Sequence, residues 1–121
     1  MNAREKAINY RAGIALLDRR FQWRDGDIKI NVDNDDEHEV AKAIVAIEKK
    51  KQGRKIIVEA IFQAIKRRAD IFDPEMMEVT EIYHSETKQS LDRKRAEYET
   101  IGVGVVFVQA TEIVNAWLRK R

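Results

Sequence analysis

Two acidic residues, Asp70 and Glu81, occupy matching positions in two apolar segments that are joined through a turn at Asp73-Pro74. If the two segments pair as neighbouring strands, the two carboxylates lie side by side. Carboxylates delivered by adjacent strands are a common way to hold a divalent metal ion against a phosphate group. The pair therefore predicts metal-dependent hydrolysis of a phosphodiester, with Mg²⁺ or Mn²⁺ as the cofactor.

Each of these acids also has a purely structural explanation. Asp70 follows Arg67 and Arg68, and a salt bridge with either arginine would compensate its charge. Glu81 lies in a strand-like alternating pattern and would equally pair with a basic residue across the sheet. We favour the metal-ligand interpretation of both acids, because each role supports the other.

Two further acids are candidates for the same site. Glu59 lies in the first expected strand, where a third metal ligand and a solvent-facing side chain are equally good interpretations. Glu39 lies in the first turn of an expected helix, where the helix dipole favours acids regardless of function. A catalytic role is therefore the less favoured interpretation of Glu39.

The composition predicts one globular domain in an intracellular, cytoplasmic setting. The chain has 121 residues, 44% hydrophobic and 36% charged, which is enough for a single hydrophobic core. It has no cysteine, which excludes disulfides and thiolate zinc sites. No apolar run approaches the roughly 18 residues of a membrane span, and the N-terminus lacks an apolar signal-peptide core.

The net charge of +2 conceals a segregation of charge along the chain. Basic residues predominate in 1–24 and 40–70, whereas acidic residues predominate in 25–39. This alternation suits a protein with a basic binding surface and a separate acidic cluster. Mixing of charges for solubility is the alternative, and we favour it for the lysine run 49–51.

Hydrophobic periodicity and capping signals predict an N-terminal helix and arm over 1–33, followed by an αβββαβα domain over 34–121. The order of three sequential strands, a crossover helix and a fourth strand predicts one mixed sheet with helices packed on it, an α/β class. The expected elements are a helix over 3–20, a short strand or arm over 28–32, a helix from Asn34 or Asp35 to the lysine run, strands over 55–62, 69–72 and 76–84, a helix over 90–100 capped by Ser85 or Thr87, a fully buried central strand over 103–108, and a helix over 112–120 capped by Thr111.

This element order and these motifs resemble the PD-(D/E)XK nuclease superfamily, which includes archaeal Holliday junction resolvases and many restriction-type nucleases. The resemblance covers about residues 34 to 110. It is carried by Arg68-Ala69-Asp70, by Val79-Thr80-Glu81-Ile82-Tyr83 and by His38-Glu39-Val40 in the first helix of the core.

The resemblance implies a restriction-endonuclease-like αβββαβ core, with the metal-binding Asp70 at the end of the second strand and Glu81 on the third. It also implies a catalytic glutamate at Glu39, a DNA substrate recognised more by structure than by sequence, and an archaeal or viral origin. Many relatives act as dimers, so a homodimer is expected by analogy, with the extra N-terminal helix as its surface.

One position departs from the family pattern. The motif lysine falls at Tyr83, and a tyrosine does not supply the positive charge that stabilises developing negative charge near neutral pH. Lys88 is the preferred replacement, and Lys94 is the alternative. The catalytic set predicted from the sequence is Asp70, Glu81, Lys88, Glu39 and Tyr83, and the metal ligands are Asp70, Glu81 and Glu59.

Basic residues near these acids predict contacts with the DNA backbone, which give shape-based recognition. The predicted contacts are Lys66, Arg67, Arg68, Arg93 and Lys94. Trp23, among arginines, is either a base-stacking residue or a packed helix end. Two other functions remain open: a catalytically inactive DNA-binding or assembly protein on a nuclease fold, favoured by Tyr83, and a small α/β interaction domain that binds no nucleic acid.

Overall fold

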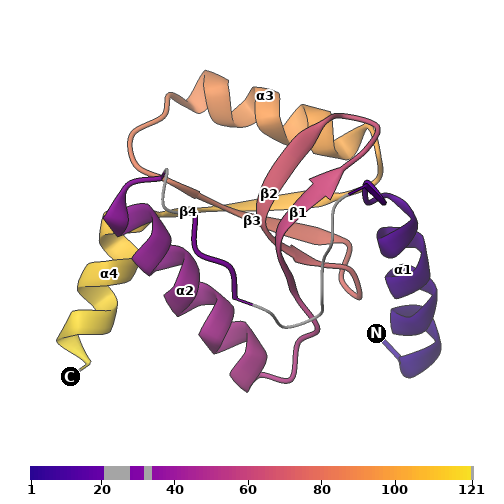
Figure 1. The fold of residues 1–121 in the computed structure, drawn as a ribbon, viewed down its shortest axis with the longest axis horizontal. Helices are drawn as coiled ribbons and strands as arrows, with labels where there is room; N and C mark the ends of the chain where they lie inside the picture. Colours follow the sequence, from indigo (N-terminus) through magenta and orange to yellow (C-terminus); the bar gives the residue numbers. More distant parts are fainter. Residues whose placement is uncertain (21–27, 32–33, 121) are drawn as a thin grey trace.

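The computed structural model describes residues 1–20, 28–31 and 34–120. Figure 1 shows a sheet with helices on both of its faces, and with the two termini at opposite ends of the view. In chain order the elements are α1 (Ala3–Ala15), α2 (Asp36–Lys51), β1 (Ile57–Phe62), β2 (Arg67–Asp73), β3 (Glu78–Tyr83), α3 (Lys88–Glu99), β4 (Gly104–Gln109) and α4 (Ala110–Arg119).

The four strands form one mixed sheet in the order β1-β2-β3-β4. Strands β1, β2 and β3 pair antiparallel, and β4 returns through α3 to pair parallel with β3. Helix α3 covers one face of the sheet, and α2 and α4 lie on the other (Figure 1). The predicted mixed α/β class is therefore confirmed.

Each face of the sheet has its own apolar core. On the α3 face, Phe62 packs edge-on against Phe72 and Tyr98, with ring centroids 4.8 and 5.7 Å away. On the α2 and α4 face, the core includes Val58 and Ile71. Alternating strand residues thus divide between two buried faces, as expected for strands that pack against helices on both sides.

The prediction that residues 103–108 form a fully buried central strand is wrong. β4 lies at the edge of the sheet, and Val106 is 42% exposed. A continuous apolar run is typical of a central strand, but the crossover through α3 sets β4 beside β3, and among the described residues no strand pairs with its other edge.

The first helix is shorter than the predicted span 3–20, because the chain after Ala15 pairs with β1. Leu17 bridges to Phe62, and the Asp18 N–H donates to the Ile61 carbonyl at 2.8 Å. Leu17 is buried in the core of the α3 face, so α1 belongs to the same hydrophobic unit as the sheet.

One of the two caps predicted for each of α2 and α3 is confirmed, and the cap predicted for α4 is wrong. Asp35 caps α2 and Thr87 caps α3, each accepting a hydrogen bond from the N–H three residues on. At α4 the cap is Gln109, whose side chain accepts from the Glu112 N–H, whereas Thr111 lies inside the helix. There the Thr111 hydroxyl instead donates to Glu37 of α2 at 2.7 Å.

Several other predicted elements shift or lie beyond the described chain. β2 is longer than the expected 69–72 and β3 is shorter than the expected 76–84. The described residues 28–31 form no strand, so the part of the 28–32 segment that can be seen is an arm. The predictions for Trp23 and its neighbours 21–27, and for 32–33, lie outside the described residues. Over the described chain, no helix is long and apolar enough to span a membrane.

Gly13 lets α1 approach the turn between β2 and β3. A Cβ at this position would lie 2.9 Å from the Pro74 Cβ and 3.0 Å from the Phe72 Cζ. Both neighbours are buried and held by rigid rings, so the helix would have to move away.

We predict that Gly13→Ala destabilises the protein by about 1–3 kcal/mol, because the crowding outweighs the ~1 kcal/mol by which alanine normally favours a helix. The measurement is urea unfolding followed by circular dichroism. The matched control is Ala12→Gly at an exposed position of the same helix, which should lose about 1 kcal/mol through helix propensity alone. A Gly13→Ala protein more stable than the parent would contradict the close packing of α1 against the β2–β3 turn.

Candidate functional site

The pairing of β2 with β3 ends just before Asp70, and the candidate site lies where the two strands separate. The β2–β3 ladder runs from Asp73–Glu78 to Ile71–Thr80 and does not include Asp70. The β1–β2 ladder also skips one pair, Glu59–Asp70, and Glu59 has a left-handed φ of 59°. Such a backbone conformation is unusual for a side chain other than glycine and is found preferentially at functional sites. Asp70 therefore lies in the middle of β2, not at its end as the resemblance implied.

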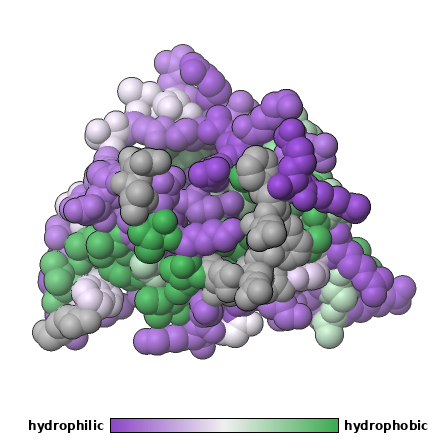
Figure 2. Space-filling model, viewed as in Figure 1, coloured by the Kyte–Doolittle hydropathy of each residue, from purple (hydrophilic) through white to green (hydrophobic). Residues whose placement is uncertain are grey.

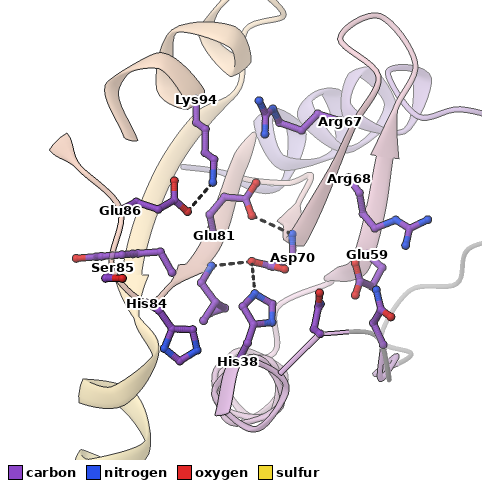
Figure 3. A pocket seen from close by; sticks show the side chains of 14 residues that line it. His38, Glu59, Arg67, Arg68, Asp70, Glu81, His84, Ser85, Glu86 and Lys94 are labelled. Atoms are coloured by element: carbon purple, nitrogen blue, oxygen red, sulfur yellow. Dashed lines mark hydrogen bonds and ion pairs between the residues drawn. The ribbon is translucent and has the colours of Figure 1, made fainter. Parts of the chain in front are cut away.

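Asp70 and Glu81 replace the missing ladder bonds with bonds from their own carboxylates. The Ile82 N–H donates to Asp70 Oδ2 at 2.7 Å, and the Asp70 N–H donates to Glu81 Oε2 at 3.4 Å (Figure 3). Each carboxylate thus accepts from the backbone of the other strand. This exchange fixes the two acids against one another, as the sequence predicted for neighbouring strands.

The pair is buried, and this changes its proton affinity. Asp70 and Glu81 are each only 8% exposed. Burial, followed by the negative charge of Asp70, raises the pKa of Glu81 to about 8, although a 2.7 Å hydrogen bond from the Tyr98 hydroxyl acts to lower it. Near neutral pH Glu81 is therefore mostly protonated.

His38 supplies the positive charge nearest to Asp70. Its Nε2 lies 3.3 Å from Asp70 Oδ2, and its Nδ1 lies 2.8 Å from Glu39 Oε2. The hydrogen bond to Asp70 raises the pKa of His38 to about 9 against the opposing effect of burial. Asp70 is thus paired with a protonated histidine of α2 and not with Arg67 or Arg68, the partners considered from the sequence.

A fully buried lysine joins the other two predicted acids. The Lys42 ammonium, with no exposed surface, lies 2.6 Å from Glu39 Oε1 and 2.7 Å from Glu59 Oε1. Burial raises the pKa of Glu39, but hydrogen bonds from Lys42, from Asn31 and Asn34 and from His38 bring it down to about 2. Glu39 is therefore ionised, and both Glu39 and Glu59 are already held by the Lys42 side chain.

The acids face an open pocket of about 450 Å³ with basic residues on its wall (Figure 3). Lys94 lines the pocket, and its ammonium donates to Glu86 Oε1 at 2.7 Å. Lys88, the preferred replacement for the motif lysine, is exposed at the start of α3 and is not among the lining residues. The lining residues are Asn31, Asn34, His38, Glu59, Arg67, Arg68, Asp70, Glu81, Ile82, Tyr83, His84, Ser85, Glu86 and Lys94.

The predicted DNA-contacting residues differ in their availability. Arg68 is exposed at the pocket mouth and Lys66 is exposed in the β1–β2 turn. Arg67 forms a salt bridge with Glu97 of α3, so it braces the pocket wall. Arg93 is exposed on α3 but does not line the pocket.

Three residues that sequence reasoning did not assign to the site prove central to it: His38, Lys42 and Tyr98. His38 and Lys42 are one helical turn apart and flank Glu39, a spacing that places their side chains on one side of α2. That spacing was a usable signal. Tyr98 gave none, because its partner Glu81 is seventeen positions away along the chain.

Across residues 1–20, 28–31 and 34–120, no three histidine, cysteine, aspartate or glutamate side chains are grouped in a way that would hold a metal ion as they stand. Two of the three predicted metal ligands, Asp70 and Glu81, do converge, whereas Glu59 is held by Lys42. Asp70 and Glu81 fit a hard divalent cation, because a cation between the two carboxylates would replace the proton on Glu81.

Comparison with known proteins adds no relative. No protein-family model matches the chain, and neither the curated proteins nor the solved structures contain a significant match.

The raised pKa of Glu81 predicts a pH-dependent stability. Between about pH 4.5 and pH 8 the folded protein holds a proton on Glu81 that the unfolded chain releases. The stability that the protonated Glu81 contributes is fully present below pH 4.5 and is lost as the pH rises through 8.

We expect the free energy of unfolding of the parent protein to fall by about 1–3 kcal/mol over that range. Glu81→Gln keeps the size of the side chain and an acceptor for Tyr98, and it should abolish this fall. The measurement is chemical unfolding of both proteins from pH 4.5 to 8 without divalent metal. His38 titrates in both proteins, so the difference between the two curves isolates Glu81. Parallel curves would show that Glu81 is ionised across the range.

Proposed function

We propose that the protein is a metal-dependent nuclease that hydrolyses phosphodiester bonds in DNA, with Asp70 and Glu81 as the metal ligands. The observation that carries the proposal is the convergence of these two buried carboxylates, through reciprocal backbone bonds, in a pocket lined by arginines and a lysine. The acids of such a pocket would bind a divalent metal ion, and its basic residues would bind the phosphate group that the metal ion activates.

A divalent cation bound to this pair would polarise the phosphate and lower the pKa of an attacking water. The chain itself holds the ligands in place. The Tyr98 hydroxyl orients Glu81, and the Ile82 N–H orients Asp70. The protonated His38 lies against Asp70 and compensates its charge before the cation arrives.

Lys94 is the better candidate for the role of the missing motif lysine. It lines the pocket from α3, whereas Lys88 does not. The Lys94 ammonium is held by Glu86 on the same wall and would transfer from that carboxylate to a phosphate oxygen when DNA enters.

A second function, DNA binding without cleavage, is favoured by one observation. Among the ion pairs of the described residues, neither Lys88 nor Lys94 contacts Asp70 or Glu81. In this alternative the carboxylates would be structural, and the basic pocket wall would serve only to bind the phosphate backbone.

The first test is cleavage of labelled linear, flapped and four-way-junction DNA with Mg²⁺ or Mn²⁺ against EDTA. We expect Asp70→Asn and Glu81→Gln each to reduce metal-dependent cleavage by roughly 10²-fold or more, because each removes a charged ligand. Glu99→Gln, at an exposed position of α3, should retain the parent rate. EDTA-insensitive binding with no cleavage under any condition would support the binding function instead.

The second test compares two lysines of the same helix. We expect Lys94→Ala to slow cleavage by about 10-fold to 10²-fold, because it removes a donor to the developing negative charge. Lys88→Ala, which removes an exposed lysine from outside the pocket, should leave the rate within about twofold. A greater loss of cleavage rate with Lys88→Ala than with Lys94→Ala would support Lys88, the replacement for the motif lysine that the sequence favoured.

A further inference from the structure

The side of α2 that faces away from the sheet carries exposed apolar side chains. Val40 is 45% exposed and Ile47 is 43% exposed, and both line a groove of about 590 Å³ with Ile30 and with Trp117 of α4. Figure 2 shows hydrophobic residues gathered over α2 and α4. Large apolar residues grouped in this way commonly mark a surface that another molecule covers.

The stripe along α2 has a regular spacing. Asp36, Val40, Ala43, Ile47 and Lys50 follow one another at intervals of four, three, four and three residues. This is the spacing of the contact positions between two packed helices. The stripe is acidic at its N-terminal end, apolar or small in the middle, and basic at its C-terminal end.

The stripe is complementary to itself when a second copy runs antiparallel. With a two-fold axis near Ala43, Asp36 lies opposite the second copy's residue 50, and Val40 lies within one residue of the position opposite its residue 47. The small side chain of Ala43 allows the helices to approach closely at the axis. A parallel arrangement would instead bring acid against acid and base against base.

We propose that the protein forms a two-fold symmetric homodimer through antiparallel packing of α2 helices. This assigns the contact to a face other than α1, the surface expected from the sequence. The proposal stands apart from the nuclease activity, because it rests on the stripe and not on the carboxylates. It is tested without DNA or divalent metal.

The first experiment is sedimentation equilibrium of the full chain at about 10–100 μM, a range that reveals micromolar association. We expect a dimer, and we expect Ile47→Glu to weaken it at least about tenfold, because two charges enter the contact. Ile8→Glu, at an exposed apolar position of α1, should leave the association unchanged. A monomeric parent protein, or a dimer unaffected by Ile47→Glu, would overturn the proposal.

The second experiment tests the register and does not depend on the stability of a charged variant. The chain has no cysteine, so single cysteines report contacts cleanly. On the two-fold axis, Ala43→Cys should form a covalent dimer on mild oxidation, because like residues meet there. Val40→Cys and Ile8→Cys should cross-link far less. Equal cross-linking of all three variants would contradict the antiparallel arrangement.

Discussion

The exchange of hydrogen bonds between Asp70 and Glu81 is the constraint on which the site depends. Where β2 and β3 separate, two backbone N–H groups lose their ladder partners, and a buried N–H without an acceptor is costly. The carboxylates provide those acceptors, each from the opposite strand. The same bonds that complete the sheet therefore hold two acids against each other in a buried position.

The electrostatic balance of the site follows from this constraint. Asp70, Glu81, Glu39 and Glu59 place four carboxyl groups around two internal cations, from His38 and Lys42. The excess negative charge is met by a proton on Glu81, whose pKa is raised by burial and by Asp70. The interior therefore holds more carboxyl groups than cations, and the pocket wall beside it carries Arg67, Arg68 and Lys94 together with Glu86.

Helix α2 connects the site to the rest of the surface. One side of it sends His38 and Lys42 towards the opening in the sheet, and its outward side carries the stripe centred on Ala43. Glu39 lies at the boundary, because it binds Lys42 and also lines the outer groove. Contacts made on the outer surface of α2 would thus bear on the helix that positions the charges of the site.

The sequence by itself determined the features that depend on neighbouring residues: the class of fold, the caps of α2 and α3 to within two neighbouring candidates each, and the juxtaposition of Asp70 with Glu81. Periodicity and capping are local, and a hairpin brings nearby strands together. Only the tertiary structure placed β4 at the sheet edge and joined Tyr98 to Glu81. Those outcomes depend on how helices cross the sheet and on which charges meet when distant segments pack, and local patterns do not encode that geometry.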